Sequence, residues 1–130
     1  LPWTVDSGDT FGFSSAGASA PWLPTPVDWG ERSVEANLTD SGSTLHLVTT
    51  AIELRKQLRE KEILSADDGG TWRVEDGGLL ICERGEQFLL AVAMGEEACR
   101  LPDGNVVLAS SPLTAEGLLP PDAAAWVLRG

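Results

Sequence analysis

Residues 87–94, QFLLAVAM, form the longest nearly continuous apolar run in the second half of the chain. A run of this length, bounded by turn residues, is typical of a strand that is buried on both faces of a sheet. Turn signals flank it, with Gly85-Glu86 before the run and Gly95-Glu96 after it. The stretch therefore predicts a fully covered strand within a β-rich C-terminal half.

Outward from this strand, the rest of 71–130 holds further short apolar or alternating runs separated by turns such as Gly77-Gly78 and PDGN at 102–105. Six short strands with turns about every eight to twelve residues predict an antiparallel β-sandwich. The expected strands are TWRVED (71–76), LLICER (79–84), QFLLAVAM (87–94), EACRL (97–101), VVLAS (106–110) and AAAWVL (123–128).

Residues 43–62 give the clearest helix prediction, because Leu47, Ala51, Leu54 and Leu58 recur at three- and four-residue spacing. The apolar arc is wide, which suits a helix packed against a large body. Asp40 or Ser41 is expected to cap its start. Basic side chains crowd its last turns, where they complement the helix dipole. They are Arg55, Lys56, Arg59 and Lys61.

Residues 1–40 are rich in Gly, Ser, Pro and aromatic residues and show almost no periodicity. Within them, APWLPTPVDW at 20–29 holds three prolines and two tryptophans, which predicts a stiff, irregular path without a helix. The stretch SSAGASA at 14–20 is predicted to be loop. So long an irregular segment is uncommon in a compact domain unless it is functional or covers another surface.

Composition excludes several classes of function. The chain has 130 residues, a formal net charge of −11 and an isoelectric point near 4.3, so it repels nucleic-acid phosphates and anionic membranes. No apolar run reaches the ~20 residues of a membrane helix. Cys82 and Cys99 lie in apolar surroundings and are expected to be buried and reduced, which favours a cytoplasmic location. Because the chain opens on Leu1 and its one methionine is Met94, we expect either a processed product or a piece of a longer protein.

The sequence shows no reaction centre. His46 is the one histidine, and no GxSxG, GxGxxG or phosphate-binding glycine motif is present. One histidine and two separated cysteines do not supply a zinc site, so neither a metal nor a cofactor is expected. The carboxylate pairs beside turns are interpreted as solvated turn residues. They are Asp67-Asp68, Glu75-Asp76 and Glu96-Glu97.

Several short motifs follow one another in a specific order along the chain. They are LPW (1–3), FGFS (11–14), PWLP (21–24), VEAN (34–37), STL (43–45) and ELR (53–55). Their order resembles the C-terminal part of bacterial α-glucosidases of the α-amylase superfamily, of the oligo-1,6-glucosidase and maltase type. The resemblance is strong over 1–55 and generic over the sheet, although the final LPPDAAAWVL (119–128) is similar to that family's last strand. Two departures are Asn37, where the family has glutamine, and Met94-Gly95, where its central strand ends on asparagine.

The resemblance implies that 1–64 is the tail of a catalytic TIM barrel, made of a loop segment and the final barrel helix. It implies that 65–130 is an antiparallel β-sandwich domain. The family's catalytic carboxylates come from earlier barrel strands, so no catalytic residue is assigned here. Trp3 and Phe11 are candidates to line the pocket mouth and stack on a sugar, with packing as the alternative role. By this resemblance Trp22 and Trp29 dock on the barrel, which is the expected partner, and an α-glucoside is met only through the parent.

Two other functions remain open. A carbohydrate-binding module would need exposed, coplanar aromatic rings on one sheet face, for which Trp72, Phe88 and Trp126 are available. Alternatively, the β-rich half is a protein-interaction or oligomerisation module. Under the α-glucosidase interpretation, residues 1–40 are expected, when the barrel is absent, either to be loose or to fold onto the sandwich by another route.

Overall fold

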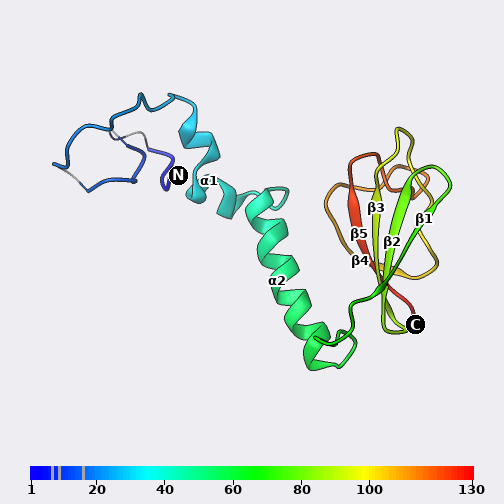
Figure 1. Cartoon of the computed structure of the whole chain (residues 1–130). Helices are drawn as coiled ribbons and strands as arrows, with labels where there is room; N and C mark the ends of the chain where they lie inside the picture. Colours follow the sequence, from blue (N-terminus) through cyan, green and yellow to red (C-terminus); the bar gives the residue numbers. More distant parts are fainter. Residues whose placement is uncertain (7, 9, 16) are drawn as a thin grey trace. The chain divides into compact units, whose positions relative to one another are not determined.

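The structure is a computed structural model of the 130-residue chain that describes every residue except Ser7, Asp9 and Ala16. It is an α+β fold, mainly β, with one long helix and one antiparallel sheet (Figure 1). Contacts divide the chain into two compact units, Leu1–Ile52 and Glu53–Gly130. The elements are η1 (Trp29–Arg32), α1 (Val34–Thr39), α2 (Thr44–Glu60), β1 (Thr71–Glu75), β2 (Leu79–Arg84), β3 (Phe88–Ala93), β4 (Asn105–Ala109) and β5 (Ala124–Leu128).

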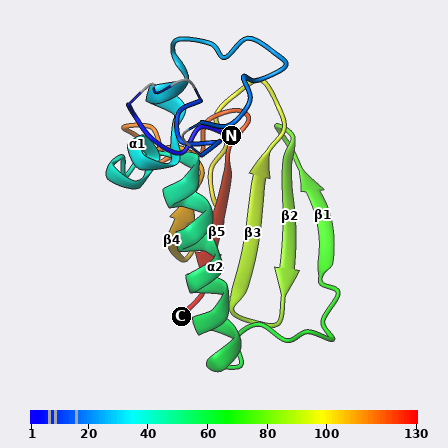
Figure 2. The ribbon, with the colours of Figure 1, turned by 90° about the vertical axis from the view of Figure 1, so that its left-hand side faces the viewer.

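The five strands form a single sheet in the order β1-β2-β3-β5-β4, so the apolar strand β3 lies at its centre (Figure 2). Every neighbouring pair is antiparallel, and a register shift between Val106 and Leu108 interrupts the pairing of β4 with β5. Five of the six expected strands are confirmed within a residue or two of their predicted ends.

The sixth expected strand, 97–101, is wrong as a strand. Cys99 makes only an isolated antiparallel bridge with Leu119, through backbone hydrogen bonds of 2.8 Å in both directions. The segment around it is therefore a loop laid against the 110–123 connection. Over the described residues the strands build one sheet, and the second sheet of the predicted sandwich is not seen.

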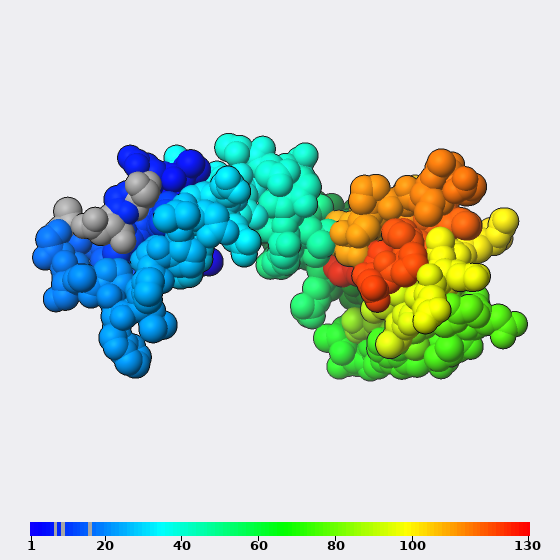
Figure 3. All heavy atoms as spheres, turned by 90° about the horizontal axis from the view of Figure 1, so that it is seen from above, coloured from blue at the N-terminus to red at the C-terminus, as the bar shows by residue number. Residues whose placement is uncertain are grey.

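One face of the sheet is sealed by these connections, and we call it the sealed face. Leu89, Ala91 and Val127 on this face are at most 1% exposed. Cys99 and Leu119 pack over them, with Leu101 and Leu113 at the margin. The two covering segments meet at the Cys99–Leu119 bridge, and Figure 3 shows this part of the chain in yellow to orange-red at the surface of the second unit.

The opposite face is covered by the end of α2, and we call it the helix-side face. Leu58 and Leu64 pack against Phe88, with Leu54, Trp126 and Leu128 around them. Leu90 and Val92 on this face stay half-buried. The prediction that β3 is buried on both faces is therefore wrong for its second half, because α2 reaches only the Phe88 end of the strand.

The long helix is confirmed at Thr44–Glu60, but neither predicted cap serves it. Ser43 does so instead, because its buried hydroxyl accepts a hydrogen bond from the His46 amide and donates one to the Asn37 carbonyl. Asp40 bonds the Gly42 amide in the turn between the helices. The Asp40 carboxylate therefore accepts its hydrogen bond from an amide that precedes α2, and it does not cap that helix.

The first unit contains two short helices, η1 and α1, that the lack of periodicity in 1–40 did not predict. Ser33, which is fully buried, caps α1 through the Ala36 amide. The N-terminus pairs with this segment, because the Val34 and Glu35 amides donate to the Pro2 and Trp3 carbonyls. The predicted loop at 14–20 includes Ala16, which lies outside the described residues.

The β1–β2 turn and the end of β3 approach each other at three glycines. A Cβ atom on Gly95 would lie 2.1 Å from the Gly77 carbonyl oxygen, and one on Gly78 would lie 2.9 Å from the Gly95 nitrogen. Gly77 and Gly78 also have φ angles of +82° and +80°, which side chains rarely adopt. The glycine at position 95 thus has a steric reason in this chain.

We expect Gly95→Ala to lower the free energy of unfolding by roughly 1–3 kcal/mol, because the new methyl group meets backbone that has no room to move. Gly69→Ala is the matched control, since a Cβ there meets nothing within 4 Å and neither glycine has a positive φ. Urea denaturation followed by circular dichroism measures both. Equal stabilities of the two variants would contradict the close approach.

Leu58→Ala is expected to destabilise the chain by about 2–5 kcal/mol, because Leu58 is 2% exposed against Phe88. Ile52→Ala on the same helix should change the stability of the isolated chain by no more than about 0.5 kcal/mol, since Ile52 is 63% exposed. The same denaturation measurement compares the two variants. A similar loss for both would show that α2 contacts something other than the helix-side face.

Candidate functional site

The two candidate residues of the N-terminal segment have different surroundings. Phe11 is buried at 6% exposure, its backbone lies at a φ of +49°, and its ring lies against Gly30. Trp3 is 50% exposed, and its amide donates to the Phe11 carbonyl at 2.7 Å. The backbone therefore brings the two residues together, while Phe11 is committed to packing and Trp3 keeps an open ring face.

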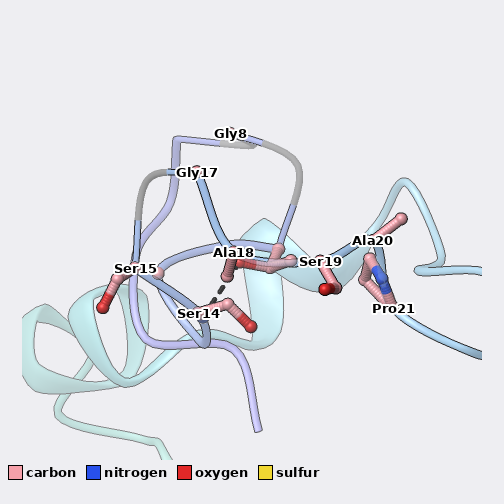
Figure 4. A pocket seen from close by; sticks show the side chains of 10 residues that line it. Gly8, Ser14, Ser15, Gly17, Ala18, Ser19, Ala20 and Pro21 are labelled. Atoms are coloured by element: carbon pink, nitrogen blue, oxygen red, sulfur yellow. Dashed lines mark hydrogen bonds between the residues drawn. The ribbon is translucent and has the colours of Figure 1, made fainter.

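A hollow of about 710 Å³ lies within the first unit (Figure 4), and neither Trp3 nor Phe11 is among the residues that line it. Its walls are small side chains and backbone, and its side-chain polar groups are hydroxyls rather than charges. Such a wall provides neither a nucleophile–base pair nor a cation site. The lining residues are Gly8, Thr10, Gly12, Ser14, Ser15, Gly17, Ala18, Ser19, Ala20 and Pro21.

The remaining sequence candidates are dispersed. His46 is exposed near the start of α2. Its backbone amide donates to the Ser43 hydroxyl and its carbonyl accepts from the Thr49 hydroxyl, whereas its imidazole makes no hydrogen bond among the described residues. Cys82 and Cys99 are free and buried, as predicted. Burial raises the pKa of the Cys82 thiol. A neutral thiol is a poor nucleophile, so Cys82 serves as a small core residue.

Asp68 and Arg84 clamp the connection between α2 and the sheet. The Asp68 carboxylate accepts hydrogen bonds from the amides of Gly70 and Gly85. These two bonds lower the pKa of Asp68, with a smaller contribution from the charge of Arg84. Arg84 in turn donates to the carbonyls of Asp68 and Ser65. The carboxylate predicted to be a solvated turn residue is therefore structural.

A second charged cluster lies at the edge of the sealed face. Arg73 contacts Glu83 at 2.6 Å and Glu75 at 3.0 Å, and Arg129 reaches Glu83 at 3.0 Å. The hydrogen bond from Arg73 is the main cause that lowers the pKa of Glu83. All four side chains are substantially exposed, so the cluster ties strand edges together and presents no paired acid and base.

The helix-side face carries a cleft of about 430 Å³. Pairing places Trp72, Cys82, Leu90 and Trp126 opposite one another in one row across β1, β2, β3 and β5. Trp72 is 56% exposed, whereas Cys82 is buried. The two tryptophans thus stand at either side of a floor made by smaller side chains, with Arg55 of α2 at the rim.

This row bears on the carbohydrate-binding alternative. Trp72, Phe88 and Trp126 do share one sheet face and one cleft. The rings of Phe88 and Trp126, however, meet edge to face, with centroids 5.5 Å apart and planes 73° apart. They do not form the flat aromatic platform that this alternative requires.

Sequence reasoning missed the cleft and the Asp68–Arg84 clamp. The alternation of Trp72 and Val74 in TWRVED was a usable signal, because it placed large apolar side chains on one face of an edge strand. For the Asp68–Arg84 clamp the sequence offers only the turn signal DDGG. This signal does not show that Asp68 pairs with Arg84, which lies 16 residues further along the chain.

No protein-family model matches the chain, and the comparison with curated proteins finds no match either. Across the described parts of the chain, no group of three or more His, Cys, Asp or Glu side chains is placed to hold a metal ion. Outside the three undescribed positions, no helix is long and apolar enough to cross a membrane.

Asp68→Asn is expected to lower the melting temperature near neutral pH and to flatten its decline in acid. The pKa of Asp68 is lower in the folded chain than in the unfolded one. Its contribution is therefore complete above the usual carboxyl pKa of about 4 and disappears as the pH falls through the lower folded value.

Thermal unfolding at a series of pH values measures this effect. Asp67→Asn is the control, because the neighbouring Asp67 is exposed and its carboxylate makes no hydrogen bond within the described residues. If the melting temperature of Asp68→Asn fell in acid as steeply as that of the wild type, the role of this carboxylate would be refuted.

Proposed function

We propose that this chain is the non-catalytic C-terminal region of a glycoside hydrolase that cleaves α-glucosidic bonds in sugars of the maltose and isomaltose type. In this proposal it stabilises the parent's catalytic barrel, which is its partner. The reacting carboxylates and the sugar-binding residues belong to the barrel, and the chain itself is inactive. The proposal rests on the order of motifs from LPW at 1–3 to ELR at 53–55.

The observation that carries the proposal is the shortage of a core in the first unit. Among its described residues, Phe11 is the one large apolar side chain that is buried. Most of the large apolar side chains that stay exposed in the chain belong to this unit, including Trp22 at 95%, Val27 at 96% and Phe13 at 66%. Exposed apolar surface on this scale marks an interaction site.

The long helix supports the same proposal. Val48 and Ile52 lie one turn apart and are 47% and 63% exposed, so α2 has an apolar stripe that the described chain leaves open. A last barrel helix needs such a stripe, because it packs against the strands inside the barrel and against the neighbouring helices. The proline-rich path at 20–29 would then cross the barrel's C-terminal face, with Trp22 and Trp29 docked on it.

The second unit supports the role of a cap. It holds the largest cluster of buried apolar residues and seals one sheet face with its own loops. In the proposal residues 65–130 of this unit correspond to the parent's C-terminal β domain, which is an antiparallel β-sandwich in the parent, and the parent resides in the cytoplasm. A carbohydrate-binding or protein-interaction module is the alternative.

The pure 130-residue chain is expected to hydrolyse neither maltose, isomaltose nor an aryl α-glucoside, whereas the protein encoded by its complete reading frame hydrolyses at least one of them. The full protein should place a barrel of some hundreds of residues before Leu1, as the ~250-residue size of a barrel requires. Turnover that co-purifies with the short chain, or a reading frame without a barrel, would overturn the proposal.

The effect of Ile52→Ala on stability distinguishes the proposed role within a parent protein from that of a self-contained module. In the full protein, Ile52→Ala should lower stability by about 2–5 kcal/mol because the side chain would be buried there. Stability that is as insensitive to Ile52→Ala in the full protein as in the short chain would argue for an independent module.

A further inference from the structure

The cleft on the helix-side face has the size and lining of a small-molecule site. Its volume of about 430 Å³ lies within the usual range for ligand pockets. Trp72 and Trp126 stand three strand spacings apart, roughly 14 Å at their backbones. Cys82 and Leu90 lie between them in the same cross-strand row. The floor of the cleft between the two tryptophans is therefore apolar.

Of the charged side chains that line the cleft, two already form hydrogen bonds within the chain and one does not. Asp68 already accepts two backbone hydrogen bonds, and Arg84 already donates to two backbone carbonyls. Arg55 is exposed at the rim and has no hydrogen-bond or ion-pair partner among the described residues. The group left to meet a ligand is therefore a guanidinium, which only donates.

The positive charge at this rim contrasts with the negative charge of the chain as a whole. The protein carries a net charge of −11, yet two of its nine basic residues line one cleft. The indole N–H groups of the two tryptophans are also donors without acceptor capacity. A ligand that suits these walls must supply acceptors and negative charge at its edge and apolar faces on either side.

We propose that this cleft binds a small planar anion, an aromatic ring that bears a carboxylate, with the ring over Cys82 and Leu90 and the carboxylate on Arg55. A guanidinium matches a carboxylate with two parallel hydrogen bonds. The site does not depend on the proposed α-glucosidase parent, and its test uses the short chain alone.

The test follows the indole N–H signals of the ¹⁵N-labelled full chain by NMR, with the five tryptophans assigned by single Trp→Phe variants. Three probes share one ring and differ in charge: naphthoate, naphthylmethanol and naphthylmethylammonium. Naphthoate should shift the signals of Trp72 and Trp126 and leave that of Trp22 unchanged. The neutral probe should bind more weakly, and the cation weakest of all.

Arg55→Ala should weaken naphthoate about fivefold, as for a solvent-exposed ion pair, and leave naphthylmethanol unchanged. Arg59→Ala is the matched control, because Arg59 is exposed on the same helix but does not line the cleft. Trp72→Ala should weaken both probes. Alanine suits a helix surface, so neither arginine variant threatens the fold.

Several outcomes would overturn the proposal. Equal affinity for the three probes, or equal shifts at Trp22 and Trp72, would indicate unspecific adsorption to apolar surface. Maltose shifts at Trp72 without a naphthoate response would assign the cleft to a neutral sugar. No response to any probe would mean that the cleft is not a ligand site.

Discussion

Strand β3 carries apolar side chains on both of its faces, and both must be kept from water. The sealed face meets this requirement with loops, since Leu89 and Ala91 have no exposed surface under Cys99 and Leu119. The helix-side face meets it only near Phe88, where Leu58 and Leu64 arrive from the end of α2. The path from α2 through Asp68 to β1 follows from this need to bring one helix end onto one end of the sheet.

The Asp68–Arg84 clamp makes that path specific. A connection of ten residues between α2 and β1 could lie in many ways, because a flexible loop pays little extra entropy for added length. The clamp removes this freedom by bonding two amides and two carbonyls of the connection and the next turn. Its groups are solvent-accessible, so it defines a route rather than adding to the core.

The strands and the long helix were predictable from the sequence because their periodicity is local. The apolar runs LLICER and FLLAVA indicate buried strands, and the leucine spacing from Leu47 to Leu58 indicates a helix. The segment EACRL looks equally strand-like but has no neighbour to extend it beyond the Cys99–Leu119 bridge, and that is a tertiary fact. Ser43 caps α2 through the His46 amide, and its second hydrogen bond, to the Asn37 carbonyl six residues earlier, depends on how the turn between the helices folds. For the candidate site, the choice of aromatic residues was visible, whereas the cross-strand row that joins Trp72 to Trp126 required the register.

The contact of Gly77 and Gly78 with Gly95 affects more than stability, because it also restricts which residues these positions can hold. The β1–β2 turn and the start of the connection after β3 share one small volume, so neither can acquire a side chain while the other stays as it is. Among relatives of this chain, these three positions should therefore change together: a residue with a Cβ atom at the end of the central strand should accompany a lengthened or re-routed first hairpin. The first hairpin and the connection after the central strand would then be inherited as one piece.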